Sequence, residues 1–99
     1  MKFQNLNIFQ KSSLNQNGYI QFLNELIIQW GYIQPTNARD VTTNFPISFK
    51  NSCFSLTTNN YNGNYYGDDT AVTVKSISKS SFVTYKVDNF GCHWIAIGI

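Results

Sequence analysis

Two segments of the chain are apolar on both sets of alternating positions, and this feature constrains the fold more than any other. Residues 26–33 read LIIQWGYI and residues 92–99 read CHWIAIGI. Successive side chains of a β-strand point to opposite faces of the sheet, so each segment would be a strand that is apolar on both faces. A sandwich strand with one face in water should instead alternate apolar and polar residues. One face of each segment can fill a core, and the other must be covered by something else.

The rest of the sequence predicts further short strands and no helix. Pro35 and Pro46 each end a candidate strand, because proline cannot donate a hydrogen bond to a ladder. No window of twelve residues has a 3.6-residue period. The candidate strands are residues 19–22, 26–34, 40–45, 53–58, 71–77, 81–87 and 92–99. Turn residues separate them, so we predict an all-β fold, an antiparallel six- to seven-stranded β-sandwich.

The length of the chain and the distribution of polar residues predict one domain with an N-terminal extension. A chain of 99 residues fits a single domain and leaves no room for a second. Residues 1–17 are polar and rich in Asn and Gln, and we interpret them as a connector or tail. Residues 18–99 carry the predicted sandwich.

The sparse charge of the chain argues against several classes of protein. Asp, Glu, Lys and Arg make up 12% of the residues, and the formal net charge is +2. The sequence contains no cluster of Lys and Arg, so we expect no nucleic-acid binding. No apolar run approaches the ~20 residues of a membrane span, and the N-terminus lacks the apolar stretch of a secretory signal. We therefore expect no membrane insertion, a chain made in a cytoplasm, and thiols at Cys53 and Cys92.

The second apolar face of the C-terminal strand predicts self-association. Exposed isoleucines on this face would be a liability in a free monomer. We expect burial against further copies of the chain, with these candidate interface residues: His93, Ile95, Ile97 and Ile99. The alternative is that residues 1–17 fold back over the same face.

The stretch from Asn59 to Asp69 is the strongest local candidate for binding. Tyrosines here lie among amides, carboxylates and glycines, and binding surfaces use this combination of rigid rings and hydrogen-bonding groups. The candidate carbohydrate-binding residues are Asn60, Tyr61, Asn62, Tyr65, Tyr66, Asp68 and Asp69, with Arg39 from an earlier loop that could join the same end of the sandwich. The alternative is a hairpin loop whose tyrosines simply pack on the sheet.

The sequence offers little support for catalysis or metal binding. Cys92 and His93 are neighbours, but adjacent strand residues point to opposite faces and cannot form a nucleophile–base pair. Asp68 and Asp69 lie in a loop without the residue order of an EF-hand. We therefore expect no enzyme, no metal and no cofactor.

Several motifs occur in an order that identifies a related family. Gly18-Tyr19 precedes LIIQWG at 26–31, FPISF at 45–49, Cys53 and finally WIAIG at 94–98. Together these resemble the C-terminal receptor-binding domain of bacteriophage tail fibres, over about residues 18–99. The ending and the FPISF segment also resemble H-type lectins. One departure is the turn at Asn24-Glu25, where the family usually has a small residue and Gly. Glu lacks the freedom of Gly at positive φ, so we expect this turn to differ from that of the family.

The resemblance implies a fold, an assembly and a role. The implied fold is a six-stranded antiparallel sandwich, assembled as a homotrimer at a fibre tip of a phage or prophage virion. The implied role is recognition of polysaccharide on the host cell surface. Two alternatives are a trimerisation or capping domain that binds no glycan, and a free-standing H-type-lectin-like carbohydrate-binding protein. A polysaccharide hydrolase is a further alternative, but it needs two carboxylates about 5–10 Å apart, and Asp68 and Asp69 would point apart in extended chain.

Overall fold

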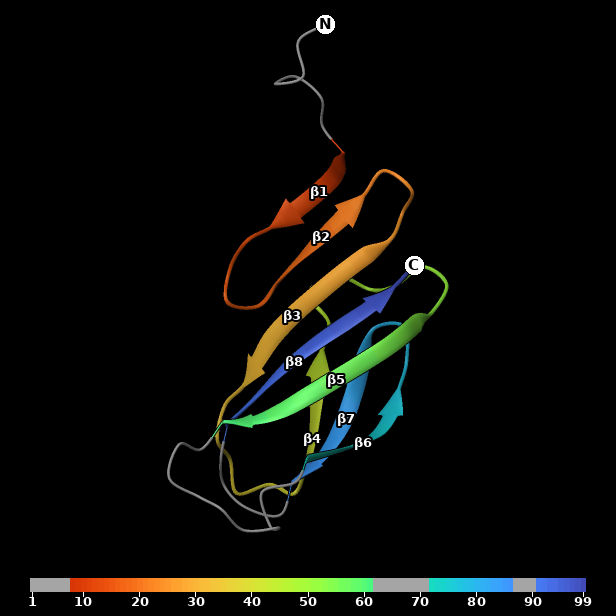
Figure 1. The fold of residues 1–99 in the computed structure, drawn as a ribbon. Helices are drawn as coiled ribbons and strands as arrows, with labels where there is room; N and C mark the ends of the chain where they lie inside the picture. The colour runs from red at the N-terminus through yellow and green to blue at the C-terminus, as the bar shows by residue number, and fades with distance from the viewer. Residues whose placement is uncertain (1–7, 62–71, 87–90) are drawn as a thin grey trace, which may run out of the picture.

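The computed structural model describes residues 8–61, 72–86 and 91–99, which form two antiparallel sheets (Figure 1). The larger sheet has the strand order β1-β2-β3-β8-β5, and the smaller has the order β4-β7-β6. The strands are β1 (Phe9–Ser13), β2 (Gly18–Phe22), β3 (Ile27–Ile33), β4 (Asp40–Asn44), β5 (Cys53–Tyr61), β6 (Val72–Ile77), β7 (Ser81–Lys86) and β8 (Gly91–Gly98). The described ranges contain no helix long and apolar enough to cross a membrane. The predicted all-β antiparallel sandwich is confirmed.

The two strands that are apolar on both faces lie side by side at the centre of the larger sheet. β3 pairs with β8 along their whole lengths, from Ile27 opposite Gly98 to Ile33 opposite Cys92. Burial alternates along all of β3 and along β8 from Cys92 onward, and the buried residues face the smaller sheet. The alternation predicted from the sequence is therefore confirmed, and the structure decides that Ile27, Gln29, Gly31 and Ile33 are the inward set of β3.

β1 is a strand that the sequence did not predict. It forms within the polar segment 1–17 and pairs with β2 at the edge of the larger sheet, with Ser12 opposite Ile20. Most of its side chains are exposed, and its sequence FQKSS lacks the alternation of apolar and polar residues that predicts a strand. It is held by backbone pairing with β2 and by the contact between the Phe9 and Phe22 rings, whose centroids lie 5.3 Å apart.

The turn between β2 and β3 places a glutamate in the left-handed region. The Glu25 amide donates to the Phe22 carbonyl oxygen at 2.9 Å, and the Phe22 amide donates to the Leu26 carbonyl oxygen at 2.8 Å. This is a three-residue hairpin loop, a type I turn followed by one residue in the left-handed conformation. Glu25 is that residue, with φ of 74°. The turn thus keeps the geometry that usually requires glycine, at a cost of roughly 1–2 kcal/mol for a residue with a Cβ atom.

The core between the sheets is built around four aromatic rings. The ring centroids of Phe82 and Trp94 lie 5.1 Å apart, and those of Phe45 and Trp94 lie 5.7 Å apart, both in edge-on geometry. Phe49 packs edge-on against Phe45 at 4.9 Å. These rings come from both sheets and from the connection between β4 and β5, so they fasten the layers together.

A fully buried glutamine fixes the connection between β4 and β5. The Gln29 Nε2 atom donates to the Ile47 carbonyl oxygen at 2.8 Å, and the Ile47 amide donates to Gln29 Oε1 at 3.0 Å. Gln29 is 0% exposed. Both polar ends of the side chain are therefore satisfied, as burial requires. This pairing explains a polar residue in the middle of the most apolar strand.

Candidate binding surfaces

The face of the larger sheet that points away from the smaller sheet is exposed and largely apolar. We call it the outer face, and its central residues are Ile28, Trp30 and Tyr32 of β3, Thr57 and Asn59 of β5, and His93, Ile95 and Ile97 of β8. Ile95 is 50% exposed and Ile97 is 36% exposed. The structure thus places three of the four candidate interface residues together on one surface.

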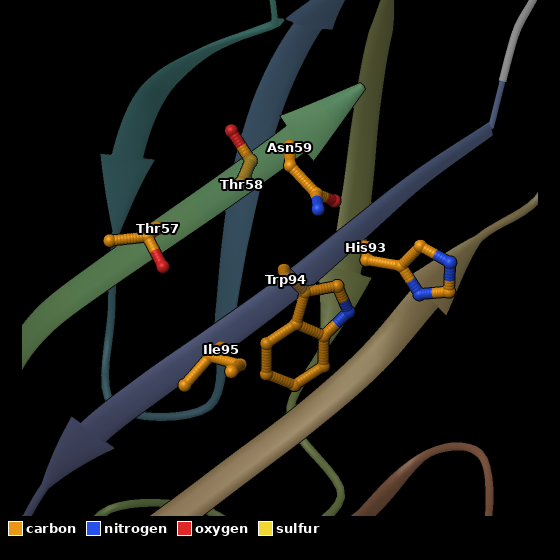
Figure 2. Close-up of a pocket in the computed structure, with 6 residues that line it drawn as sticks. All are labelled: Thr57, Thr58, Asn59, His93, Trp94 and Ile95. Atoms are coloured by element: carbon orange, nitrogen blue, oxygen red, sulfur yellow. The ribbon is translucent and has the colours of Figure 1, made fainter. Parts of the chain in front are cut away.

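Polar groups lie toward one end of the outer face. The rings of Tyr32 and His93 lie 4.8 Å apart across the β3–β8 ladder. Beside them β5 and β8 form a shallow depression of about 130 Å³, lined by Thr57, Thr58, Asn59, His93, Trp94 and Ile95 (Figure 2). Ligand pockets are typically larger, at about 300–1,000 Å³. This depression can accept a side chain from a partner, but it cannot enclose a sugar.

The N-terminal segment lies at the edge of the larger sheet as far as it is described. Residues 9–13 form β1 beside β2, so residues 8–17 extend the sheet and leave Ile95 exposed. Ile99 differs from the other three candidates. It lies beyond the end of β8, is only partly exposed, and lines a separate cleft with Ile27 and Lys50.

The ends of six strands meet at one end of the sandwich, which we call the loop end. Ile33 pairs with Cys92 and Tyr61 pairs with Gly91 in the larger sheet. In the smaller sheet Val72 pairs with Lys86, and Asp40 pairs with Tyr85. Figure 1 places these strand ends together at the lower end of the sandwich. The strand ends that flank residues 34–39, 62–71 and 87–90 therefore gather at one end, whose described part includes Arg39.

Arg39 is held by a side chain from the neighbouring strand. Its Nη1 atom donates to the Tyr85 hydroxyl oxygen at 3.0 Å. Next along the chain, both Asp40 carboxylate oxygens accept from Lys75 Nζ, at 3.1 and 3.2 Å. The Asp40 and Lys75 side chains are about half exposed, so this pair contributes at most about 1 kcal/mol. These four side chains give the loop end a fixed polar rim.

Most of the predicted carbohydrate-binding residues lie outside the described part of the chain. These are Asn62, Tyr65, Tyr66, Asp68 and Asp69. Asn60 and Tyr61 are the last two paired residues of β5, opposite Cys92 and Gly91. Their backbone position puts them at the loop end, where Arg39 also lies.

The cysteines and the histidine form no catalytic arrangement. Cys92 is fully buried, whereas His93 is exposed on the outer face, so the two side chains lie on opposite faces as predicted. Cys53 pairs with Gly98 and Asn60 pairs with Cys92, so the thiols lie at opposite ends of one ladder. At ~3.3 Å per residue this separates them by roughly 20 Å, and neither forms a disulfide. No group of three or more His, Cys, Asp or Glu side chains suited to a metal ion occurs among the described residues.

The described fold agrees with a match between this chain and a known family. Residues 21–99 match the family model described as "Putative tail fiber protein gp53-like, C-terminal". The chain belongs to this family of tail-fibre C-terminal domains. It is thus a tail-fibre domain, the kind of domain found in fibres of phage or pyocin particles.

Solved structures of pyocin fibres have a similar fold. An N-truncated R2-type pyocin tail fibre superposes with a TM-score of 0.79 and 23% identity, over 90% of this chain and 37% of that chain. The C-terminal part of the R1 pyocin fibre of P. aeruginosa gives a TM-score of 0.56 and 27% identity, over 90% of this chain and 28% of that chain. The uncharacterized protein MJ0347 of Methanocaldococcus jannaschii is 29% identical over 103 residues, which is 89% of this chain and 66% of that protein. The chain therefore spans less than two thirds of each of these relatives.

Two glycines of the family-like motifs have a packing role. A Cβ atom at Gly31 would lie 2.6 Å from Trp94 Nε1, and one at Gly98 would lie 2.7 Å from a ring carbon of Phe49. Neither glycine has a positive φ. The glycines that end LIIQWG and WIAIG therefore make room for core rings, a role that sequence alone did not reveal.

Proposed function

We propose that this tail-fibre domain forms the tip of a phage or prophage fibre, assembles as a homotrimer, and binds carbohydrate on the surface of the host cell. The observation that carries the proposal is the exposed outer face of a domain that belongs to a tail-fibre family. Two exposed isoleucines at the centre of a sheet favour burial against another subunit. The proposed interface consists of His93, Ile95 and Ile97, with Ile99 at its margin.

The loop end is the proposed site of glycan recognition. Its proposed residues are Arg39, Asn60, Tyr61, Asn62, Tyr65, Tyr66, Asp68 and Asp69. Loops held on a rigid scaffold commonly carry binding residues. Arg39, fixed by Tyr85, supplies a positioned donor for sugar hydroxyls.

Assembly is tested by measuring the solution mass with light scattering behind a sizing column. We expect the mass of three chains at low micromolar concentration. A clean monomer would contradict the trimer and would favour a small, free-standing lectin-like domain.

Recognition is tested by adsorption of the purified protein to candidate host cells. The triple variant Tyr61→Ala, Tyr65→Ala and Tyr66→Ala should lose adsorption and keep the wild-type mass. Tyr85→Phe is a narrower test of the described rim, because it keeps the ring and removes only the hydroxyl that accepts from Arg39, so it should weaken adsorption and keep the wild-type mass.

The second candidate is a trimerisation or capping domain that binds no glycan. The apolar character of the outer face favours it, since assembly alone would account for that surface. Unchanged adsorption by an intact trimer of the tyrosine variant would support this structural role. Release of reducing sugar from host polysaccharide would instead support the hydrolase alternative.

A further inference from the structure

A polar cleft lies at the end of the sandwich opposite the loop end. It has a volume of about 330 Å³, which suits a single sugar ring with its substituents. It lies between the β1–β2–β3 part of the larger sheet and the connection from β4 to β5. Its lining residues are Lys11, Gln21, Glu25, Ile27, Ile47, Ser48, Lys50 and Ile99.

One wall of the cleft is a row of three residues across the larger sheet. Lys11 pairs with Gln21, and Gln21 pairs with Ile27, so the three side chains share one face. Ile27 is 2% exposed and belongs to the core, so this is the face opposite the outer face. β1 and β2 extend past the smaller sheet (Figure 1), which leaves this part of the face uncovered. Trimer assembly through the outer face would therefore leave the cleft accessible.

The opposite wall is held rigidly by hydrogen bonds. Gln29 binds both polar backbone groups of Ile47. The Phe49 amide donates to the Lys79 carbonyl oxygen at 2.7 Å, and the Asn51 amide donates to the Ile99 carbonyl oxygen at 2.8 Å. Ser48 and Lys50 thus project from a fixed stretch of backbone, and a ligand would not have to order this wall.

The charged side chains around the cleft are unpaired. Lys11, Lys50 and Glu25 make no side-chain hydrogen bond and no ion pair with any other described residue. By contrast, Lys75 is paired with Asp40 at the loop end. Two ammonium groups and one carboxylate around a cleft provide donors for an anion and an acceptor for hydroxyl groups.

Glu25 adds an independent observation, because it occupies a strained backbone position. Among the described residues other than glycine, Glu25 is the one with a positive φ, which is 74°. Glycine would fit this turn without strain. Strained residues that persist in a fold are candidates for function, and this one lines the cleft.

We propose that the cleft binds an anionic sugar residue, one that carries a carboxylate or a phosphate group. Lys11 and Lys50 bind the anionic group, while Glu25 accepts hydrogen bonds from ring hydroxyls. Ile47, which is only partly buried, provides an apolar surface for the C–H face of the sugar. The class of ligand rests on the proposed function, whereas the site itself rests on the geometry of the cleft.

The test is an NMR titration of the full chain with sodium glucuronate, glucose 6-phosphate and neutral methyl glucoside at constant ionic strength. An anionic sugar should shift the amide signals of Gln21, Ile47 and Ser48 in a saturable manner, and methyl glucoside should bind more weakly. Lys50→Gln and Lys11→Gln should each weaken this binding about tenfold, the usual effect of losing one charged hydrogen bond. Lys79→Gln removes a lysine outside the cleft and should leave it unchanged. No saturable shift, or equal shifts in the lysine variants, would overturn the proposal.

Glu25 allows a second, independent test. Glu25→Gly should raise the melting temperature by about 5 °C because it relieves the strained φ, and it should weaken binding of the anionic sugar. Glu25→Gln keeps the strain and removes the charge, so it should weaken binding without raising the melting temperature. A more stable Glu25→Gly variant with unchanged binding would show that the carboxylate has no part in the site.

Adsorption to host cells separates this proposal from the proposed function. If Lys50→Gln leaves adsorption intact while the tyrosine variant loses it, the cleft proposal fails and the proposed function stands. If glucuronate binds in the cleft but the protein adsorbs to no host, the cleft proposal stands and the proposed function fails.

Discussion

The two faces of β8 are built from similar apolar residues but have opposite surroundings. On the inner face, Trp94 is 2% exposed and Ala96 is 0% exposed. On the outer face, Ile95 between them is 50% exposed. The smaller sheet covers the first face, whereas no described residue of the chain covers the second. Hydrophobic residues therefore mark a face that requires burial, but the arrangement of the sheets decides whether the chain itself supplies the cover.

The polar residues of the two faces differ in the same way. On the inner side, Gln29 of β3 and Thr84 of β7, across the core, are fully buried, and each makes hydrogen bonds to the backbone. On the outer face, Thr57, Asn59 and His93 are exposed beside a small depression. The inner face is thus part of the core, and the outer face has the composition of an interface that water still reaches.

The largest expected effect comes from removing the central ring of the inner face. Trp94→Ala should lower the free energy of unfolding by about 3–5 kcal/mol, because it leaves a cavity beside the rings of Phe45 and Phe82. Urea denaturation measures the loss. Ile95→Ala is the matched control on the outer face. Its loss should depend on chain concentration, since it acts through assembly, whereas the loss for Trp94→Ala should not. If Trp94→Ala and Ile95→Ala lowered the free energy of unfolding equally and independently of chain concentration, the two faces would not differ in the way proposed.

The next effect concerns the buried glutamine. Gln29→Leu keeps the volume but leaves the Ile47 amide and carbonyl without partners, and should cost about 1–3 kcal/mol in urea denaturation. Gln34→Leu, at an exposed position just beyond β3, should change the free energy of unfolding by less than about 0.5 kcal/mol. A neutral Gln29→Leu variant would mean that the connection between β4 and β5 does not depend on this side chain.

On the outer face, Ile95→Lys should affect assembly rather than the fold of the single chain. We expect a change of less than about 0.5 kcal/mol in the unfolding of the dissociated chain, because Ile95 is half exposed. Light scattering should report the mass of one chain, since a lysine in an apolar interface would be desolvated. Thr73→Lys on the exposed side of β6 is the control and should keep the mass of the wild type. A trimer that survives Ile95→Lys would place the interface elsewhere.

The smallest expected effect is a pH dependence at the margin of the core. Burial raises the pKa of the Cys53 thiol above its ordinary value of 9.0, and hydrogen bonding to the Ser55 and Ile97 backbone partly offsets this. The unfolded chain therefore loses this proton first as the pH rises. The contribution to stability is fully present below the pKa of the unfolded state and is lost as the pH rises through the pKa of the folded state. The melting temperature of the wild type should fall relative to that of Cys53→Ser between pH 8 and pH 10.5. It is measured for both proteins at intervals of about half a pH unit. A constant difference would contradict the shift.

The alternation of residues along β3 and β8 was sufficient to divide the side chains of each strand between two faces, but not to show which face of β3 points inward. Ile27, Gln29 and Ile33 are buried, while His93, Ile95 and Ile97 lie on the other face, as the period of two requires. The same reasoning could not find β1, because most of its residues are exposed and its sequence FQKSS does not alternate apolar and polar residues. Nor could it find the cleft, whose lysines are distant in sequence and meet only because β1 pairs with β2 beside the β4–β5 connection. The unusual residue in the turn, Glu25, was the signal that sequence offered for that region.

The sequence by itself determined the class of fold, the two alternating faces of the central strands and the family of the chain. These properties depend on local periodicity and on short motifs, which are written in the order of residues. Only the tertiary structure decided that the smaller sheet covers one face of β8 and leaves the other exposed, and that Lys11, Glu25 and Lys50 surround one cleft. Such arrangements depend on pairings between distant strands, and the free energy of those pairings is not contained in any single segment of the chain.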